Sequence, residues 1–151
     1  GISVQQLIKT MVEHLHPSTS STDIRQHMLE YCQMLGIKPE FLSRSINDGF
    51  SGGEQKRLEM LQLLMAKPKC AILDEIDSGL DVDAIKTIAI AVKHAITEFH
   101  SSFLVVTHYR RILDQLVPNQ VHVLVNGKIH KTGNASLIGE IEQAGYGQYL
   151  S

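Results

Sequence analysis

The chain has 151 residues, of which 43% are hydrophobic and 20% charged, a composition that can bury a core and excludes a disordered chain. The formal net charge of −2 leaves no broad basic surface for nucleic acid or an anionic membrane, so we expect neither partner. No apolar run is long enough to cross a bilayer, and residues 1–15 have an amphipathic helical pattern, unlike a signal peptide. We therefore expect a soluble, cytoplasmic protein with no direct membrane insertion.

The first third of the chain predicts short helices. Apolar residues recur at helical spacing in residues 3–15 and 22–35, and a further helical turn is expected over residues 39–44. Thr22 or Asp23 is the expected N-cap of the second helix. The residues expected to form the apolar stripes of the two helices are Val4, Leu7, Ile8, Met11, Val12, Leu15, Ile24, Met28, Cys32 and Leu35.

A different signal follows in the segment INDGFSGGEQKRLEM, residues 46–60. Ser51 and Glu54 have the spacing of a capping box, in which each side chain accepts a hydrogen bond from the backbone N–H of the other residue. That pattern by itself predicts only the start of a helix. Gly52 and Gly53 add a second interpretation, because they leave bare a helix N-terminus, where unpaired N–H groups and the helix dipole favour an anion.

From this point helices and strands alternate. A helix is expected over residues 52–66, a short apolar strand at 70–73, a long helix capped by Asp81, and a second apolar strand at 103–107. Continuous apolar runs of this length are typical of strands covered on both faces of a parallel sheet, and the order is that of a βαβ unit. The apolar stripe of the long helix comprises Val82, Ile85, Ala89, Val92, Ile96 and Phe99.

The last part of the chain predicts a hairpin between two short helices. Asn126 and Gly127 are a strong hairpin signal. The strands that they join are expected at residues 120–125 and 128–132, and the helices at 109–116 and 135–144.

Neither the cysteines nor most of the histidines have the spacing of metal ligands. Cys32 and Cys70 stand far apart, and Cys70 lies within an apolar strand, so we expect two buried thiols rather than a disulfide or a metal site. Of the eight histidines, only His108 stands where a function is expected.

The two expected parallel strands both end in polar residues. Asp74 and Glu75 follow the first strand, and His108 follows the second. Parallel strands end at the same edge of a sheet, which is where open α/β sheets bind ligands. In phosphoryl transfer, an acid at a strand end can hold Mg²⁺ and a neighbouring acid can orient or deprotonate the attacking water. These roles suit Asp74 and Glu75, with His108 beside a terminal phosphate.

Four short motifs in this order resemble the second half of ABC-type ATPases. The motifs are the signature at residues 50–54, the Walker B strand at 70–75, the D-loop at 78–81, and the switch histidine, His108. The resemblance implies an α/β fold, part of a P-loop NTPase core of ABC type. It also implies two domains: a helical signature subdomain, residues 1–66, and the C-terminal part of the ATPase core, residues 67–151.

The resemblance further implies ATP and Mg²⁺ as cofactors and a role for each site residue. Asp74 would bind Mg²⁺, while Glu75 and His108 would be catalytic, activating water and holding the γ-phosphate. A composite site would form in a head-to-tail dimer. The residues that would contact the ATP of the opposing subunit are Ser51, Gly52, Gly53, Glu54 and Asp81.

Within this family the chain resembles the SufC-type ATPases of the Suf iron–sulfur cluster assembly system. That resemblance implies SufB-like and SufD-like scaffold proteins as partners, bound beside the signature helix. The features that carry it are Glu54, Gly79, Tyr109 and the Gly145-Tyr146 pair, and the departures from it are Gln55 and Ile76.

Three other functions are weighed against this one. A nucleotide-binding subunit of a membrane transporter would share every catalytic residue and differ in its partner. A DNA-repair ATPase would need a coiled coil before the signature and a basic surface, and the sequence has neither. A noncatalytic interaction module remains the fourth interpretation.

The sequence also lacks a P-loop: no Gly-x-x-x-x-Gly-Lys-[Ser/Thr] occurs in its 151 residues. We therefore expect a fragment of a longer ATPase that by itself neither binds ATP tightly nor hydrolyses it, and whose unpaired apolar strands favour self-association. Lys56 and Arg57 are expected on a solvated helix face, and a resting-state pair between Lys56 and Glu75 is an alternative.

Overall fold

The computed structural model describes residues 1–46 and 49–145. The chain divides into two compact units, residues 1–109 and residues 110–151. Within the described ranges, no helix is both long enough and apolar enough to cross a bilayer. The boundary expected at residue 66 lies inside the first of these units, and the division into a helical subdomain and an ATPase core stays a prediction.

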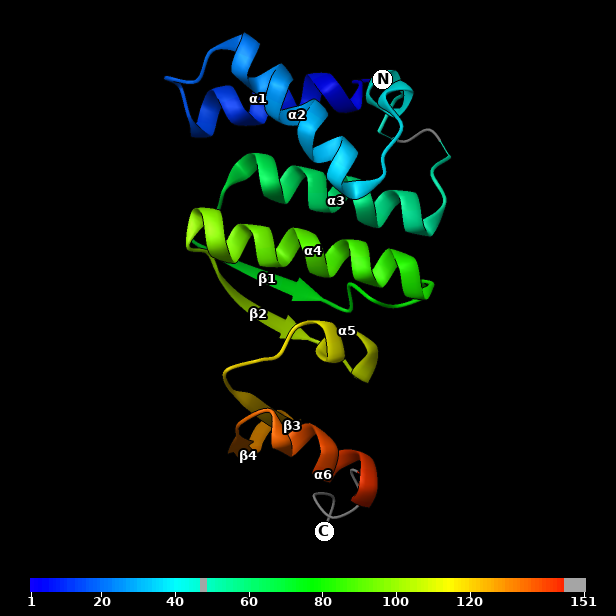
Figure 1. The fold of residues 1–151 in the computed structure, drawn as a ribbon, viewed down its shortest axis with the longest axis vertical. Coiled ribbons are helices and arrows are strands. Elements are labelled where there is room, and N and C mark those ends of the chain that lie inside the picture. The colour runs from blue at the N-terminus through cyan, green and yellow to red at the C-terminus, as the bar shows by residue number, and fades with distance from the viewer. Residues whose placement is uncertain (47–48, 146–151) are drawn as a thin grey trace. The chain divides into compact units, whose positions relative to one another are not determined.

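Four α-helices and a short 3-10 helix form most of the first unit (Figure 1). They are α1 (Val4–Leu15), α2 (Ser21–Leu35), η1 (Pro39–Ser43), α3 (Gly52–Ala66) and α4 (Val82–Phe99). Helix α3 packs against α1, α2 and α4. The core contributed by α2 and α3 includes Met28, Cys32, Leu35, Leu61 and Leu64, all less than 4% exposed.

The N-cap predicted for α2 was wrong by two or three residues. Helix α2 is capped by Ser20, whose hydroxyl accepts from the Asp23 backbone N–H at 3.1 Å and donates to the Asp23 carboxylate at 2.7 Å. Asp23 therefore serves as the third helical residue, where its carboxylate also meets the positive end of the helix dipole.

Strands β1 (Cys70–Asp74) and β2 (Ser102–Val106) form a parallel pair, as the βαβ pattern predicted. Cys70 pairs with Ser102 and Asp74 with Val106. Helix α4 connects the two strands, and Asp81 caps it, its carboxylate accepting from the Ala84 N–H at 2.7 Å.

The prediction that both faces of these strands are covered was wrong in the described part of the chain. Leu73 is buried on one face, whereas Ile72 is 70% and Leu104 is 51% exposed on the other. Cys70 shares that open face and is exposed, so only Cys32 fits the expectation of a buried thiol. An apolar run indicates that a strand suits burial but does not say which segment covers it.

Some residues of the predicted apolar helix stripes are also exposed. Ile85, Ala89 and Val92 of α4 are buried, but Val82 and Ile96 are exposed. Of the α1 stripe, Leu15 is also exposed, because it lies in the last turn.

In the second unit a β-hairpin packs against a helix, α6 (Ser136–Ala144). Strands β3 (Val121–Val125) and β4 (Lys128–Gly133) pair antiparallel, and helices α5 (Arg110–Gln115) and α6 flank them in sequence. Asn126 and Gly127 both have positive φ, 49° and 75°, which is the requirement of a type I′ hairpin turn. The small core comprises Val123, Val125 and Leu137, with Val121 and Ile141 at its margin.

Candidate functional site

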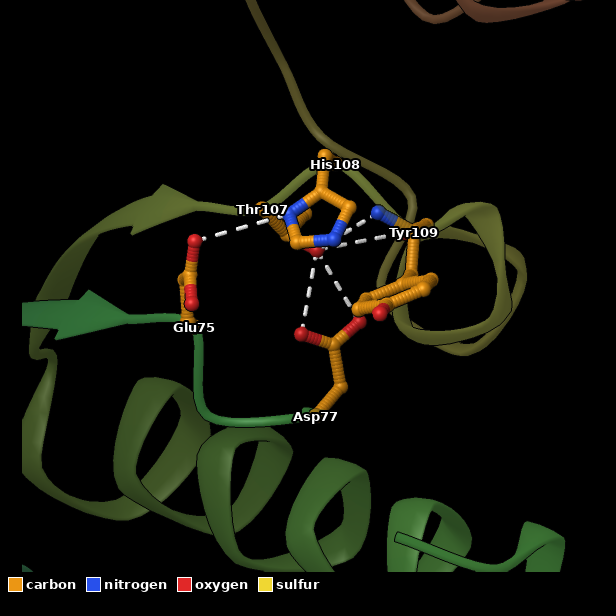
Figure 2. Close-up of polar contacts among 5 residues, drawn as sticks. All are labelled: Glu75, Asp77, Thr107, His108 and Tyr109. Atoms are coloured by element: carbon orange, nitrogen blue, oxygen red, sulfur yellow. Dashed lines mark hydrogen bonds and ion pairs between the residues drawn. The ribbon is translucent and has the colours of Figure 1, made fainter. Parts of the chain in front are cut away.

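The carboxyl ends of β1 and β2 bring Glu75 and His108 together. The Glu75 Oε1 atom lies 3.5 Å from His108 Nδ1 (Figure 2). Both side chains are more than half exposed, so this contact stabilises the fold little and leaves both groups open to a ligand. The expectation that parallel pairing brings these residues to one edge is confirmed as geometry; their catalytic roles stay predictions.

The backbone of Glu75 is held in an unusual conformation. Its φ is +45°, in the left-handed region that costs a residue with a side chain about 1–2 kcal/mol. Its N–H donates to the Val106 carbonyl at 2.9 Å, and its own carbonyl accepts from the Ser78 N–H at 3.1 Å. The first bond extends the pairing with β2 by one residue, and the second closes a turn. Together they turn the chain sharply out of the sheet immediately after Asp74.

A buried side-chain pair anchors this turn to the second strand. Asp77 is only 4% exposed, and each of its carboxylate oxygens lies 3.0 Å from the Thr107 hydroxyl, which shares its proton between them. The Thr107 oxygen in turn accepts from the Tyr109 backbone N–H at 2.9 Å. Sequence reasoning missed this pair. The available signal was an acid two residues beyond Glu75 and a threonine at the end of the parallel neighbour.

The signature segment forms the expected capping box at the start of α3. The Ser51 N–H donates to the Glu54 carboxylate at 2.8 Å, and the Glu54 N–H donates to the Ser51 hydroxyl at 3.4 Å. The bond from the Ser51 backbone is the main cause that holds the pKa of Glu54 below its ordinary value, with the Ser51 hydroxyl and nearby Arg44 and Arg57 adding to it.

The two glycines of this turn are not required by the fold. Neither Gly52 nor Gly53 has a positive φ. A Cβ atom on Gly52 would meet nothing within 4 Å, and one on Gly53 would meet only the Leu80 side chain, at 3.9 Å. The capping box uses the N–H groups of Ser51 and Glu54, and no described residue accepts from those of Gly52 and Gly53. The helix N-terminus is therefore open to an acceptor from another molecule.

The structure agrees with the first expectation for Lys56, a partly solvated helix face on which its side chain is 28% exposed, and not with the alternative pair with Glu75. Lys56 pairs with Glu59 at 3.0 Å and not with Glu75, because Glu59 lies one turn along the same helix. Arg57 fits that expectation only in part: the residue is partly exposed, but its Nε is buried without a hydrogen-bond partner among the described residues, and its Nη1 lies 3.5 Å from the Gly36 carbonyl.

Asp74 is exposed at the end of β1 and lines a groove of about 210 Å³ beside Lys56 and Glu59. Within residues 1–46 and 49–145, no three His, Cys, Asp or Glu side chains converge on a metal-sized site. A magnesium ion held by one or two carboxylates and by phosphate oxygens does not need such a cluster, so Asp74 suits the proposed role without forming a complete metal cage.

Comparison with known proteins places these features in a family. The profile of the ABC transporter family matches residues 3–78. The chain is 46% identical over 134 residues to the iron–sulfur cluster assembly protein SufC of Plasmodium berghei, covering 89% of this chain and 36% of that protein. It is 46% identical over 125 residues to the probable ATP-dependent transporter SufC of Escherichia coli, covering 83% of this chain and 50% of that protein.

Solved structures agree on the fold. The dimeric structure of a bacterial ABC transporter cassette superposes with a TM-score of 0.74 at 19% identity, covering 89% of this chain and 57% of that chain. This chain spans between 36% and 51% of the length of the curated relatives it matches. Residues 47, 48 and 146–151, which include Tyr146 of the expected Gly-Tyr pair, lie outside the described residues. From the profile, the identity to SufC proteins and the fold, the chain belongs to the ABC transporter family of ATPases, and its relatives there are of SufC type.

Proposed function

We propose that this chain is the signature and Walker B part of a SufC-type ATPase that energises iron–sulfur cluster assembly. The observation that carries the proposal is the meeting of Glu75 and His108 at one strand edge, 3.5 Å apart. Glu75 accepts a proton from the attacking water at a carboxylate oxygen, and His108 donates a hydrogen bond to the terminal phosphate. The 46% identity to proteins named SufC supports the setting in cluster assembly.

Two places in the chain suit Mg-ATP. Asp74 offers the hard carboxylate oxygens that Mg²⁺ prefers, and the bare N–H groups of Gly52 and Gly53 suit phosphate oxygens. When bound, the metal and the nucleotide supply the electrophilic phosphorus. The Asp81 carboxylate is already engaged as the cap of α4, so any contact it makes with a partner's nucleotide must use its other oxygen or its backbone.

The proposal includes a head-to-tail dimer, in which Ser51, Gly52, Gly53 and Glu54 complete the site of the opposing subunit. A cassette of the same fold was solved as a dimer, which supports this arrangement. SufB-like and SufD-like scaffold proteins are the proposed partners, and the cytoplasm is the proposed location. Because the P-loop is absent from the sequence, the chain by itself is predicted neither to bind ATP tightly nor to hydrolyse it.

The test is a chimera in which this chain replaces the matching half of its Escherichia coli relative. We expect Mg²⁺-dependent ATP hydrolysis by the chimera. Glu75→Gln should lower kcat at least about 100-fold and leave ATP binding intact, since an amide cannot accept the proton of the attacking water. Glu98→Gln, in an exposed position near the end of α4, is the matched control and should leave kcat unchanged. A Glu75→Gln chimera with full activity would refute the proposed role of Glu75.

The alternative is the nucleotide-binding subunit of a membrane transporter, and the name of the Escherichia coli relative favours keeping it. The two functions differ in the partner. Copurification of the chimera with SufB and SufD scaffolds supports cluster assembly, whereas copurification with a transmembrane subunit supports transport.

A further inference from the structure

Two aromatic rings from consecutive residues lie against each other at the strand edge. The ring centroids of His108 and Tyr109 are 3.9 Å apart, with the planes inclined by 40°. In Figure 2, Glu75 lies to the left of the His108 ring and Tyr109 to the right. Consecutive side chains of a strand point to opposite faces, so this contact requires the chain to have left the strand geometry of β2.

The turn that brings the rings together is held by a hydrogen bond to a buried carboxylate, that of Asp77. The Thr107 hydroxyl oxygen accepts from the Tyr109 N–H at 2.9 Å, which closes a turn around His108. The same hydroxyl is held by the buried carboxylate of Asp77. The backbone that carries both rings is therefore tied to the turn that precedes the D-loop and does not depend on the rings themselves.

The contact with Glu75 does not by itself fix the imidazole. The Glu75 and His108 side chains are 57% and 54% exposed, and a polar contact between side chains this exposed contributes little net free energy. The Tyr109 ring occupies the space on the other side of the imidazole, and an aromatic contact favours one side-chain rotamer over its alternatives about two- to tenfold. The Tyr109 hydroxyl makes no hydrogen bond within the described residues, so only the ring is engaged.

We propose that Tyr109 is a positioning residue: its ring holds the His108 imidazole in the rotamer that faces Glu75. This inference rests on the proposed function, because only a catalytic role of His108 and Glu75 makes the orientation of the imidazole matter. Its physical content is nevertheless a side-chain orientation that can be measured on this chain without nucleotide.

The experiment is solution NMR of the labelled chain with Tyr109→Leu and Tyr109→Phe variants. The readouts are the His108 χ1 couplings, the ring-current displacement of its imidazole protons, and the nuclear Overhauser contact between the imidazole and the Glu75 side chain. Tyr109→Leu should lower the ratio of the Glu75-facing rotamer to the others about two- to tenfold and abolish the ring-current displacement. Tyr109→Phe should retain the rotamer ratio and the Glu75 contact, since it keeps the ring.

Cross-strand contacts between Ile72 and Leu104, which face each other in the β1–β2 register, report whether the sheet is intact. If Tyr109→Leu disturbs them, Tyr109→Gln provides a second ringless side chain of similar reach. Unchanged His108 rotamers in a folded ringless variant would overturn the inference, as would equal loss of the Glu75 contact in Tyr109→Phe. The two proposals fail in different measurements. Undiminished ATP hydrolysis by the Glu75→Gln chimera would contradict the proposed function and would leave these NMR results unchanged.

Discussion

Replacing Thr107 by valine is expected to destabilise the unit formed by residues 1–109 by about 2 kcal/mol. Valine keeps the shape of threonine, so the substitution removes the hydroxyl and leaves packing nearly unchanged. That hydroxyl lies 3.0 Å from both oxygens of the Asp77 carboxylate, which is 4% exposed. A hydrogen bond to a charged group contributes about 1.5–3 kcal/mol, and a buried carboxylate that loses its donor cannot recover it from bulk water.

The second bond of Thr107 adds little to this figure. The Tyr109 N–H, which donates to the Thr107 oxygen, lies in an exposed segment, so water replaces the lost acceptor at small cost. The estimate therefore stays near the middle of the range for a single charge-assisted bond.

The assay is urea unfolding followed by far-ultraviolet circular dichroism, since helices α1 to α4 all belong to this unit. Thr107→Ser keeps the hydroxyl and is expected to cost only the lost methyl group, about 1 kcal/mol or less. The decisive measurement is the double-mutant cycle with Asp77→Ala, where the two changes should couple by at least about 1 kcal/mol. Additive losses, or a loss below about 0.5 kcal/mol for Thr107→Val, would refute the reasoning.

Three further predictions concern the helices and the cysteines. Ser51→Ala should lower the stability of the same unit by about 1 kcal/mol in urea unfolding, because it removes the N-cap of α3, and an unchanged midpoint would contradict the capping box. The pKa of Glu54 is lower in the folded than in the unfolded chain, so its carboxylate contributes fully to stability above its ordinary pKa of 4.5, and this contribution is lost as the pH falls through the folded pKa. Glu54→Gln should therefore remove this part of the pH dependence of the urea midpoint. Iodoacetamide should modify the exposed Cys70 quickly and Cys32 only on unfolding, since burial raises the Cys32 pKa to about 11; equal rates by mass spectrometry would contradict this.

The sequence predicted those elements whose signals are local. The helix at Gly52–Ala66 begins where Ser51 and Glu54 form their box, and the hairpin turns at Asn126 and Gly127 because both can adopt positive φ. The parallel pairing of β1 and β2 was also predictable, because the strand–helix–strand order leaves little choice of topology.

The features that the sequence could not predict are mostly those decided by contacts between segments far apart along the chain. Ile72 and Cys70 have the pattern of a buried strand, but their exposure is decided by what packs on that face. The cap of α2 was misassigned because Ser20, Thr22 and Asp23 all have suitable side chains, and only the backbone geometry selects Ser20. At the site, motif order identified Glu75 and His108, whereas the Asp77–Thr107 bond required the strand register, which no local pattern contains.

The strained backbone of Glu75 and the Asp77–Thr107 hydrogen bond belong to the same turn and act together. The left-handed backbone of Glu75 costs about 1–2 kcal/mol, which interactions elsewhere in the fold must offset. The Asp77–Thr107 hydrogen bond, two residues further along, contributes about the same amount. The same bond joins the segment that follows the turn to the end of β2, so it helps to hold the reversal in place. The side chain of Glu75 thus projects into solvent beside His108 from a backbone fixed on both sides, an arrangement that suits a group meant to act on a bound molecule.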